Sequence, residues 1–145
     1  MANRDKAEEE LRRLSMEMRY LEQTADALQQ RISMVNAALT DINYANMTLD
    51  GMEKEKENSE MLIPIGGSSY VKVKLADTNK VIIGMGSGVS VEKTLPEAKT
   101  TLKERLDELE KTMHSAQQQL SQVAERINSG RSRLESMLST REGKQ

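Results

Sequence analysis

Apolar residues recur along the first third of the chain at alternating steps of three and four. The series consists of Leu11, Leu14, Met18, Leu21, Ala25, Leu28, Ile32, Val35, Leu39 and Ile42. A repeat of 3.5 residues keeps one narrow stripe of a helix turned toward a partner helix, as in a coiled coil. The pattern predicts a helical segment over residues 1–58. Gly51 lowers the helix propensity near the end of this segment. We expect the helix to fray after Lys56, at Asn58 and Ser59.

The same alternation returns in the last third of the chain. Its members are Leu106, Leu109, Met113, Ala116, Leu120, Val123 and Ile127, followed after Gly130 by Leu134 and Met137. Thr94 and Glu97 are spaced as a capping box, with Pro96 in the first turn of the helix that follows. A second coiled-coil helix is therefore predicted over residues 95–145, ending in a short flexible tail.

We expect the two helical segments to form an antiparallel hairpin, because they have similar lengths and a compact insert joins them. Aligning Glu53 with Leu95 places apolar residues opposite one another, and it sets the long side chain of Met18 opposite Gly130. The same alignment brings an acidic start beside a basic end, as flanking positions of a coiled coil require. The charged residues concerned are Glu8, Glu9, Glu10, Glu17 and Glu22 at the start and Arg126, Arg131 and Arg133 at the end.

Between the helices, residues 59–94 read as β-structure. Four short apolar or alternating runs are separated by turn residues, and the natural division is two β-hairpins. A segment this short cannot bury a core alone. We therefore expect it to join subunits, as an oligomerisation module in an α+β fold with a long antiparallel coiled coil. The residues predicted to contribute are Ile63, Ile65, Val71, Val73, Leu75, Val81, Ile82, Ile83, Val89 and Val91.

Composition and charge argue against several classes of protein. The chain has 145 residues with no Phe, Trp or Cys, and its aromatic content is 2%, so a disulfide framework and Cys-ligated metals are excluded. Its net charge is −2, and no segment is basic enough to predict nucleic-acid binding. The chain has no apolar run of membrane-spanning length. We expect a cytoplasmic protein with no membrane partner.

The candidate chemical motifs have ordinary structural explanations. Gly84, Gly86 and Gly88 superficially resemble a phosphate-binding loop, but a strand follows them where such a loop requires a helix. The only histidine, His114, lies one position past the seam and is expected to face solvent. The sequence therefore predicts no enzyme, no metal site and no cofactor.

Methionine is unusually abundant, with ten residues. Met16 lies off the seam, and the free ends of the hairpin carry more apolar surface than one seam can cover. Flexible, polarisable side chains suit promiscuous binding, although ordinary coiled-coil ends would also explain them. The predicted binding residues at these tips are Leu11, Leu14, Met16, Met18, Leu134, Met137 and Leu138.

Two stretches of the β-region are more specific. LIPIGGSSYVK at residues 62–72 and KVIIGMGSGVSVEKT at residues 80–94 closely resemble the alpha class of archaeal prefoldin subunits. The plan of helix, two hairpins and helix is similar to that class along nearly the whole chain. The beta class carries a single hairpin, so two hairpins favour alpha.

This resemblance implies a hexamer of two alpha and four beta subunits on a double β-barrel. Such an assembly captures non-native proteins without ATP at the tips of its coiled coils and passes them to a group II chaperonin. By position, the seven tip residues would contact the client. An alternative is a self-assembling structural or filament-forming prefoldin-like protein.

Overall fold

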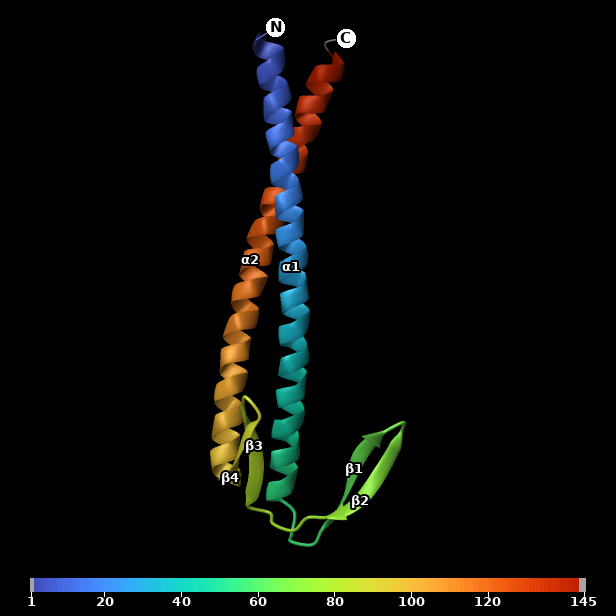
Figure 1. Ribbon diagram of the computed structural model, residues 1–145, viewed down its shortest axis with the longest axis vertical. Coiled ribbons are helices and arrows are strands. Elements are labelled where there is room, and N and C mark those ends of the chain that lie inside the picture. The colour runs from blue at the N-terminus through green and yellow to red at the C-terminus, as the bar shows by residue number, and fades with distance from the viewer. Residues whose placement is uncertain (1, 144–145) are drawn as a thin grey trace. The chain divides into compact units, whose positions relative to one another are not determined.

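The computed structural model describes residues 2–143 of the chain, as two long helices that bracket four strands (Figure 1). The elements are α1 (Ala2–Glu53), β1 (Glu60–Gly66), β2 (Ser69–Lys74), β3 (Lys80–Gly86), β4 (Val89–Thr94) and α2 (Leu95–Gly143). The fold class and the order of elements are as predicted. Helix α2 continues to Gly143, and the last two residues of the predicted tail lie outside the described part.

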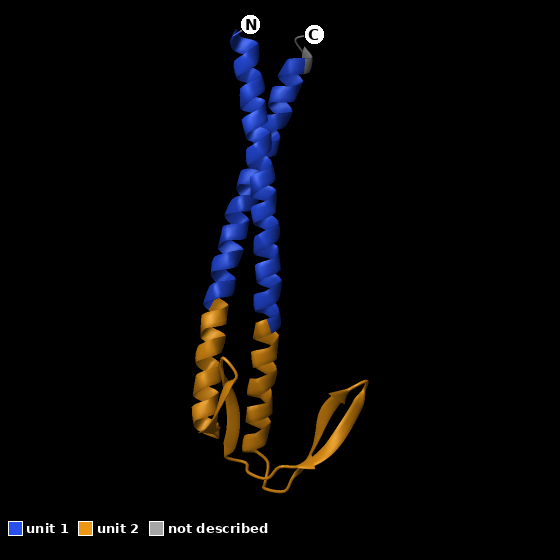
Figure 2. Cartoon of the chain, in the orientation of Figure 1, with its two compact units in different colours: residues 1–37, 111–145 blue, residues 38–110 orange. Residues whose placement is uncertain are grey.

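The chain divides into two compact units (Figure 2). The first unit, residues 1–37 and 111–145, contains the N-terminal part of α1 and the C-terminal part of α2. Its buried apolar residues are Met18, Leu21, Leu28, Val35 and Ala116, all of them members of the two predicted seams. Met18 lies directly against Gly130, which confirms the predicted alignment of the helices at this point.

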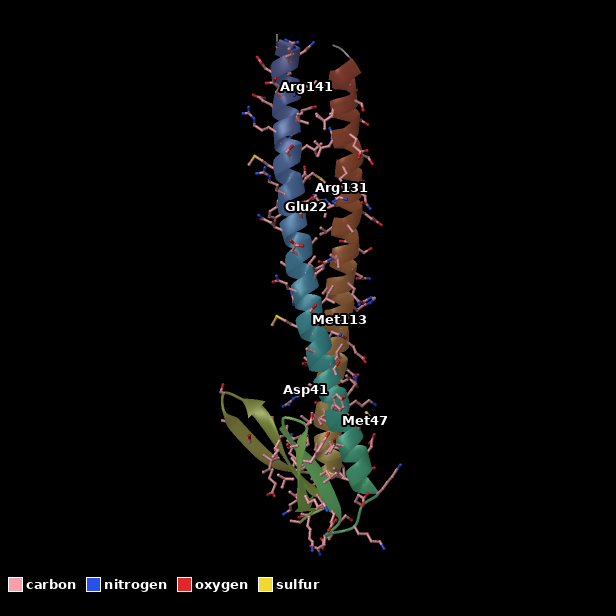
Figure 3. All side chains as sticks on the ribbon, turned by 90° about the vertical axis from the view of Figure 1, so that its right-hand side faces the viewer. Glu22, Asp41, Met47, Met113, Arg131 and Arg141 are labelled. Carbon is pink, nitrogen blue, oxygen red and sulfur yellow. The ribbon has the colours of Figure 1, made fainter. Side chains whose placement is uncertain are left out.

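Ion pairs cross between the two helices of the first unit. An Nη2 atom of Arg126 lies 3.4 Å from Oε1 of Glu17, and one of Arg131 lies 3.9 Å from Oε1 of Glu22. Arg141 pairs with Glu8 in the same way at 3.3 Å. Glu22, Arg131 and Arg141 are labelled in Figure 3. Exposed pairs contribute about 0–1 kcal/mol each, so these contacts help to fix register more than stability.

The second unit, residues 38–110, contains the other ends of both helices and all four strands. Helix α1 ends at Glu53, three residues before the predicted end. The amides of Lys54 and Glu55 donate to the carbonyls of Gly51 and Met52, three residues back. Such tight bonds close the last turn of a helix. Helix α2 begins as predicted, because the amide of Glu97 donates to Oγ1 of Thr94 at 3.3 Å.

The strands form two separate antiparallel hairpins, β1–β2 (hairpin 1) and β3–β4 (hairpin 2). In hairpin 1, Ile63 pairs with Val71, and a bulge follows Pro64. In hairpin 2, Ile83 pairs with Val91, and a bulge follows Gly84. Both hairpins were predicted from the alternation of apolar and turn residues.

Hairpin 2 packs on the helix ends of its own unit. Its Ile83 is 6% exposed. The helix-end cluster that buries it consists of Leu49, Met52, Leu95 and Ala98, with Leu75, Val81 and Leu102 packed around it.

Two basic side chains hold this arrangement. Nη2 of Arg105 donates to the carbonyl oxygen of Gly84 at 2.7 Å, which ties hairpin 2 to α2. Nζ of Lys99 lies 2.8 Å from Asp50 and 2.7 Å from Glu53, which ties α2 to the end of α1. The hydrogen bonds from Lys99 to Asp50 and then to Glu53 raise the pKa of the lysine above its usual value.

Candidate client-binding and assembly surfaces

The predicted tip residues lie on the two helices of the first unit and differ in how they are exposed. Leu11 and Leu14 of α1 and Leu134 and Met137 of α2 are half-buried along the seam. Outside the seam, Met16 is 68% exposed and Leu138 is 46% exposed. Half-buried seam residues therefore lie on the same helices as exposed apolar side chains near the free ends.

Met18 differs from the other predicted tip residues in its burial. Its side chain is only 6% exposed, and its Sδ is the atom nearest to the position that a Cβ of residue 130 would occupy. The missing side chain at Gly130 leaves a space between the helices, and Met18 fills it. It therefore belongs to the interior of the coiled coil.

Tyr20 is an apolar surface residue that the seam pattern did not reveal. It is 69% exposed and lies four residues after Met16, on the same face of α1. Both side chains line a shallow hollow between charged neighbours, among them Arg12, Arg13 and Glu17. The spacing from Met16 was the available signal, because two bulky apolar residues at i and i+4 outside a seam share one exposed face.

Most residues predicted for assembly are exposed in the isolated chain. Exposed fractions of 41–75% are found for the apolar strand residues Ile63, Ile65, Val71, Ile82, Val89 and Val91. Ile83 is the clear exception, since it is buried in the helix-end cluster, and Val81 and Leu75 pack against the same cluster. These three residues therefore have contacts within their own chain, and their contribution to a partner contact stays a prediction.

Two exposed apolar residues of α1 in the second unit were also missed. Tyr44 is 67% exposed and Met47, labelled in Figure 3, is 69% exposed. They lie outside the seam, on the face of the helix away from Leu49. In the sequence they stand in a stretch from Ala38 to Leu49 whose single charged residue is Asp41, and this scarcity of charge is the signal that could have found them.

Within residues 2–143, no helix is both long enough and apolar enough to cross a membrane. In the same range no three His, Asp or Glu side chains come together as a metal site.

Two long helices that bracket two β-hairpins with exposed apolar residues define a coiled-coil protein with a β-hairpin insert. The family model described as "Prefoldin subunit" matches residues 21–138. The chain belongs to the prefoldin family of chaperone subunits, in its alpha class.

Curated relatives support this placement. The prefoldin subunit alpha of Methanococcoides burtonii is 32% identical over 85% of this chain and 89% of its own length. The prefoldin subunit alpha of Pyrococcus horikoshii is 34% identical over 81% of this chain and 80% of its own length.

Solved structures share the fold. A filamentous PFD from Methanocaldococcus jannaschii, solved by cryo-EM, matches with a TM-score of 0.66 and 20% identity, over 77% of this chain and 93% of that one. The prefoldin beta subunit from Thermococcus strain KS-1 matches with a TM-score of 0.58 and 16% identity, over 88% of this chain and 90% of that one.

Proposed function

We propose that this chain is an ATP-independent chaperone subunit that captures non-native proteins through apolar side chains near the free ends of its helices. It assembles with beta-class subunits into a hexamer of two alpha and four beta chains, on a β-barrel built from the hairpins. The hexamer passes its clients to a group II chaperonin. The observation that carries the proposal is the exposure of Met16 and Leu138 beside a half-buried seam, in a member of the prefoldin family.

The energetics favour shared, weak contacts. If one pair of helix ends buries roughly 150 Å² of apolar client surface, the gross gain is about 4 kcal/mol at 25 cal/mol per Å². Association costs on the order of 4–15 kcal/mol cancel most or all of that gain. Several ends on one scaffold raise the effective concentration of binding surface and hold the client. Weak individual contacts also allow the client to leave for a chaperonin.

The proposal is tested with the assembled complex. The chain carrying Met16→Ser and Leu138→Ser is combined with a beta-class subunit, and suppression of the aggregation of a chemically denatured client is measured by light scattering. We expect protection to fall severalfold while the mass of the complex stays unchanged. Met34→Ser is the matched control, because Met34 is 74% exposed and lies outside the predicted tip. Equal protection by the double variant and the control would contradict client capture at this surface.

Self-assembly into a filament is the second candidate. It is favoured by the bare apolar strands of hairpin 1 and by the filamentous state of the structural neighbour from Methanocaldococcus jannaschii. Exposed strand edges and faces template pairing with other chains. Light scattering of the purified chain alone separates the two functions, because a filament gives an open-ended size distribution and a hexamer subunit does not.

A further inference from the structure

A surface hollow lies on the N-terminal part of α1, outside the coiled-coil seam, and we call it the α1 hollow. Its lining comes from this one helix and consists of Glu9, Arg12, Arg13, Met16, Glu17 and Tyr20. These positions form two neighbouring rows with a spacing of four residues, namely 12, 16 and 20, and 9, 13 and 17. Side chains of a packing partner insert into the groove between two such rows. The α1 hollow therefore has the form of a binding groove.

One end of the α1 hollow is apolar. Met16 and Tyr20 are each more than two-thirds exposed, whereas the neighbouring seam residue Met18 is buried. Packing of the coiled coil therefore does not account for the two exposed side chains. Methionine adapts its shape to what it contacts, and tyrosine offers a rigid flat surface at a low cost in conformational entropy. This end suits an aliphatic or aromatic side chain from another chain.

The other end of the α1 hollow carries a net positive charge. Glu17 is already paired with Arg126 of α2, at 3.4 Å. Among the described residues, the ion pairs that cross between the helices include neither Arg12 nor Arg13. With Glu17 neutralised, the lining has two guanidinium groups and one carboxylate, that of Glu9. A guanidinium group binds a carboxylate through two parallel hydrogen bonds, so this end suits acidic groups.

We propose that the α1 hollow binds client segments in which an aliphatic or aromatic residue is followed closely by acidic residues. The apolar side chain of the client packs on Met16 and Tyr20, and the client's carboxylates pair with the two arginines. Eight positions separate Arg12 from Tyr20, which is about 12 Å along a helix. About four residues of extended chain span that distance. A non-native chain presents extended segments of this length to solvent.

This preference rests on the proposed client-capture function and adds a selectivity that apolar contact alone would not give. It is measured on the complex with a beta-class subunit, with an environment-sensitive dye attached at Gln23→Cys. The chain has no native cysteine, and position 23 lies three residues after Tyr20 on the same helix face, so the dye reports binding beside the hollow. The probes are disordered glycine–serine peptides with several copies of a leucine–tryptophan pair, followed by two acidic residues, two amides or two lysines. Several copies are used because a single contact is weak.

The basic end is tested by the order of the three affinities and by removal of the arginines. We expect the acidic probe to bind about threefold to tenfold more tightly than the amide probe, and the lysine probe most weakly. Arg12→Gln combined with Arg13→Gln should lower the affinity of the acidic probe to that of the amide probe. The matched control, Arg31→Gln with Lys111→Gln, removes the same charge from exposed positions outside the hollow and should keep the preference. Added salt should reduce the preference of the native complex, because it screens exposed ion pairs.

The apolar end is tested by Tyr20→Ser. This change should lower the affinity of the acidic probe and of the amide probe severalfold, because both probes lose the same apolar contact. Met34→Ser, at an exposed methionine outside the hollow, should leave both affinities unchanged. Circular dichroism checks that every variant keeps its helix content, and sedimentation velocity checks that each variant still assembles with the beta-class subunit.

Four results would overturn the proposal. Equal binding of the acidic and amide probes would remove the preference, and tighter binding of the lysine probe would mean that Glu9 and Glu17 dominate the hollow. Binding that Tyr20→Ser does not weaken would place the client on the seam instead, and the absence of any probe binding would refute the hollow altogether. In each case client capture itself stands if the native complex still suppresses the aggregation of a denatured client, and it fails if that suppression is absent.

Discussion

Gly130 offers a test of how the coiled coil of the first unit is packed. The change Gly130→Ala adds one methyl group in the middle of α2. In a free helix this substitution stabilises by about 1 kcal/mol, because alanine has the higher helix propensity. Here the added Cβ would overlap Sδ of Met18, so Met18 or the facing helix must move.

The magnitude follows from the two opposed effects. Forcing an extra methyl group into a packed interior costs about 1–3 kcal/mol, which cancels or exceeds the gain in propensity. The net effect expected for Gly130→Ala is between about zero and 2 kcal/mol of destabilisation. Gly51→Ala is the matched comparison, because its Cβ meets no other atom and the full gain of about 1 kcal/mol is expected in the monomer.

The assay is thermal unfolding followed by circular dichroism, at a concentration where sedimentation gives the monomer mass. A difference of 1 kcal/mol corresponds to about 2–4 °C in Tm for a chain of this size. We expect Gly51→Ala to raise Tm by about that amount and Gly130→Ala to leave it unchanged or lower it. In a Met18→Ala background the clash is gone, so Gly130→Ala should now stabilise. If Gly130→Ala raises Tm as much as Gly51→Ala does in the native background, the reasoning about Met18 is refuted.

Three further predictions concern the second unit. Thr94→Ala removes the cap of α2 and should lower stability by about 1 kcal/mol, as measured by urea unfolding, whereas Thr94→Ser should retain most of it. Arg105→Met removes the hydrogen bond to Gly84 and should speed amide hydrogen exchange in the β3–β4 turn severalfold, and unchanged exchange would show that this bond does not hold hairpin 2. The folded-state pKa of Lys99 is raised. The contribution of Lys99 to folding stability is therefore fully present below its unfolded-state pKa of about 10.4, and it is lost as pH rises through the folded-state pKa. Urea unfolding at pH 8 and pH 11 should therefore show a smaller loss of stability for Lys99→Met than for the native chain.

Several features of the fold could be predicted because their physical cause is local. The heptad series fixes which stripe of each helix is buried, and the match of Met18 with Gly130 followed from one alignment. Alternation and turn residues located the hairpins, since side chains on a strand alternate by geometry. The Thr94 cap could be placed in the same way, because capping involves residues only three positions apart.

The candidate surfaces were harder to predict, because exposure depends on what packs against each face. Ile63 and Ile83 occupy equivalent positions of a repeated hairpin, and nothing in their own strands tells which one is covered. The exposure of Tyr44 and Met47 likewise depends on the position of α2 and hairpin 2. The local sequence pattern does not indicate which distant residues pack against a given face.

The amino-acid sequence by itself determined the two helical seams, the two hairpins, their boundaries to within a few residues and the resemblance to prefoldin. Periodicity and turn chemistry are local, and they survive in any arrangement of the elements. Only the tertiary structure decided that the helix ends cover Ile83 and that Ile63, Tyr44 and Met47 stay exposed. Those outcomes depend on contacts between residues far apart in the chain, where volume and distance decide which of two similar apolar faces is buried.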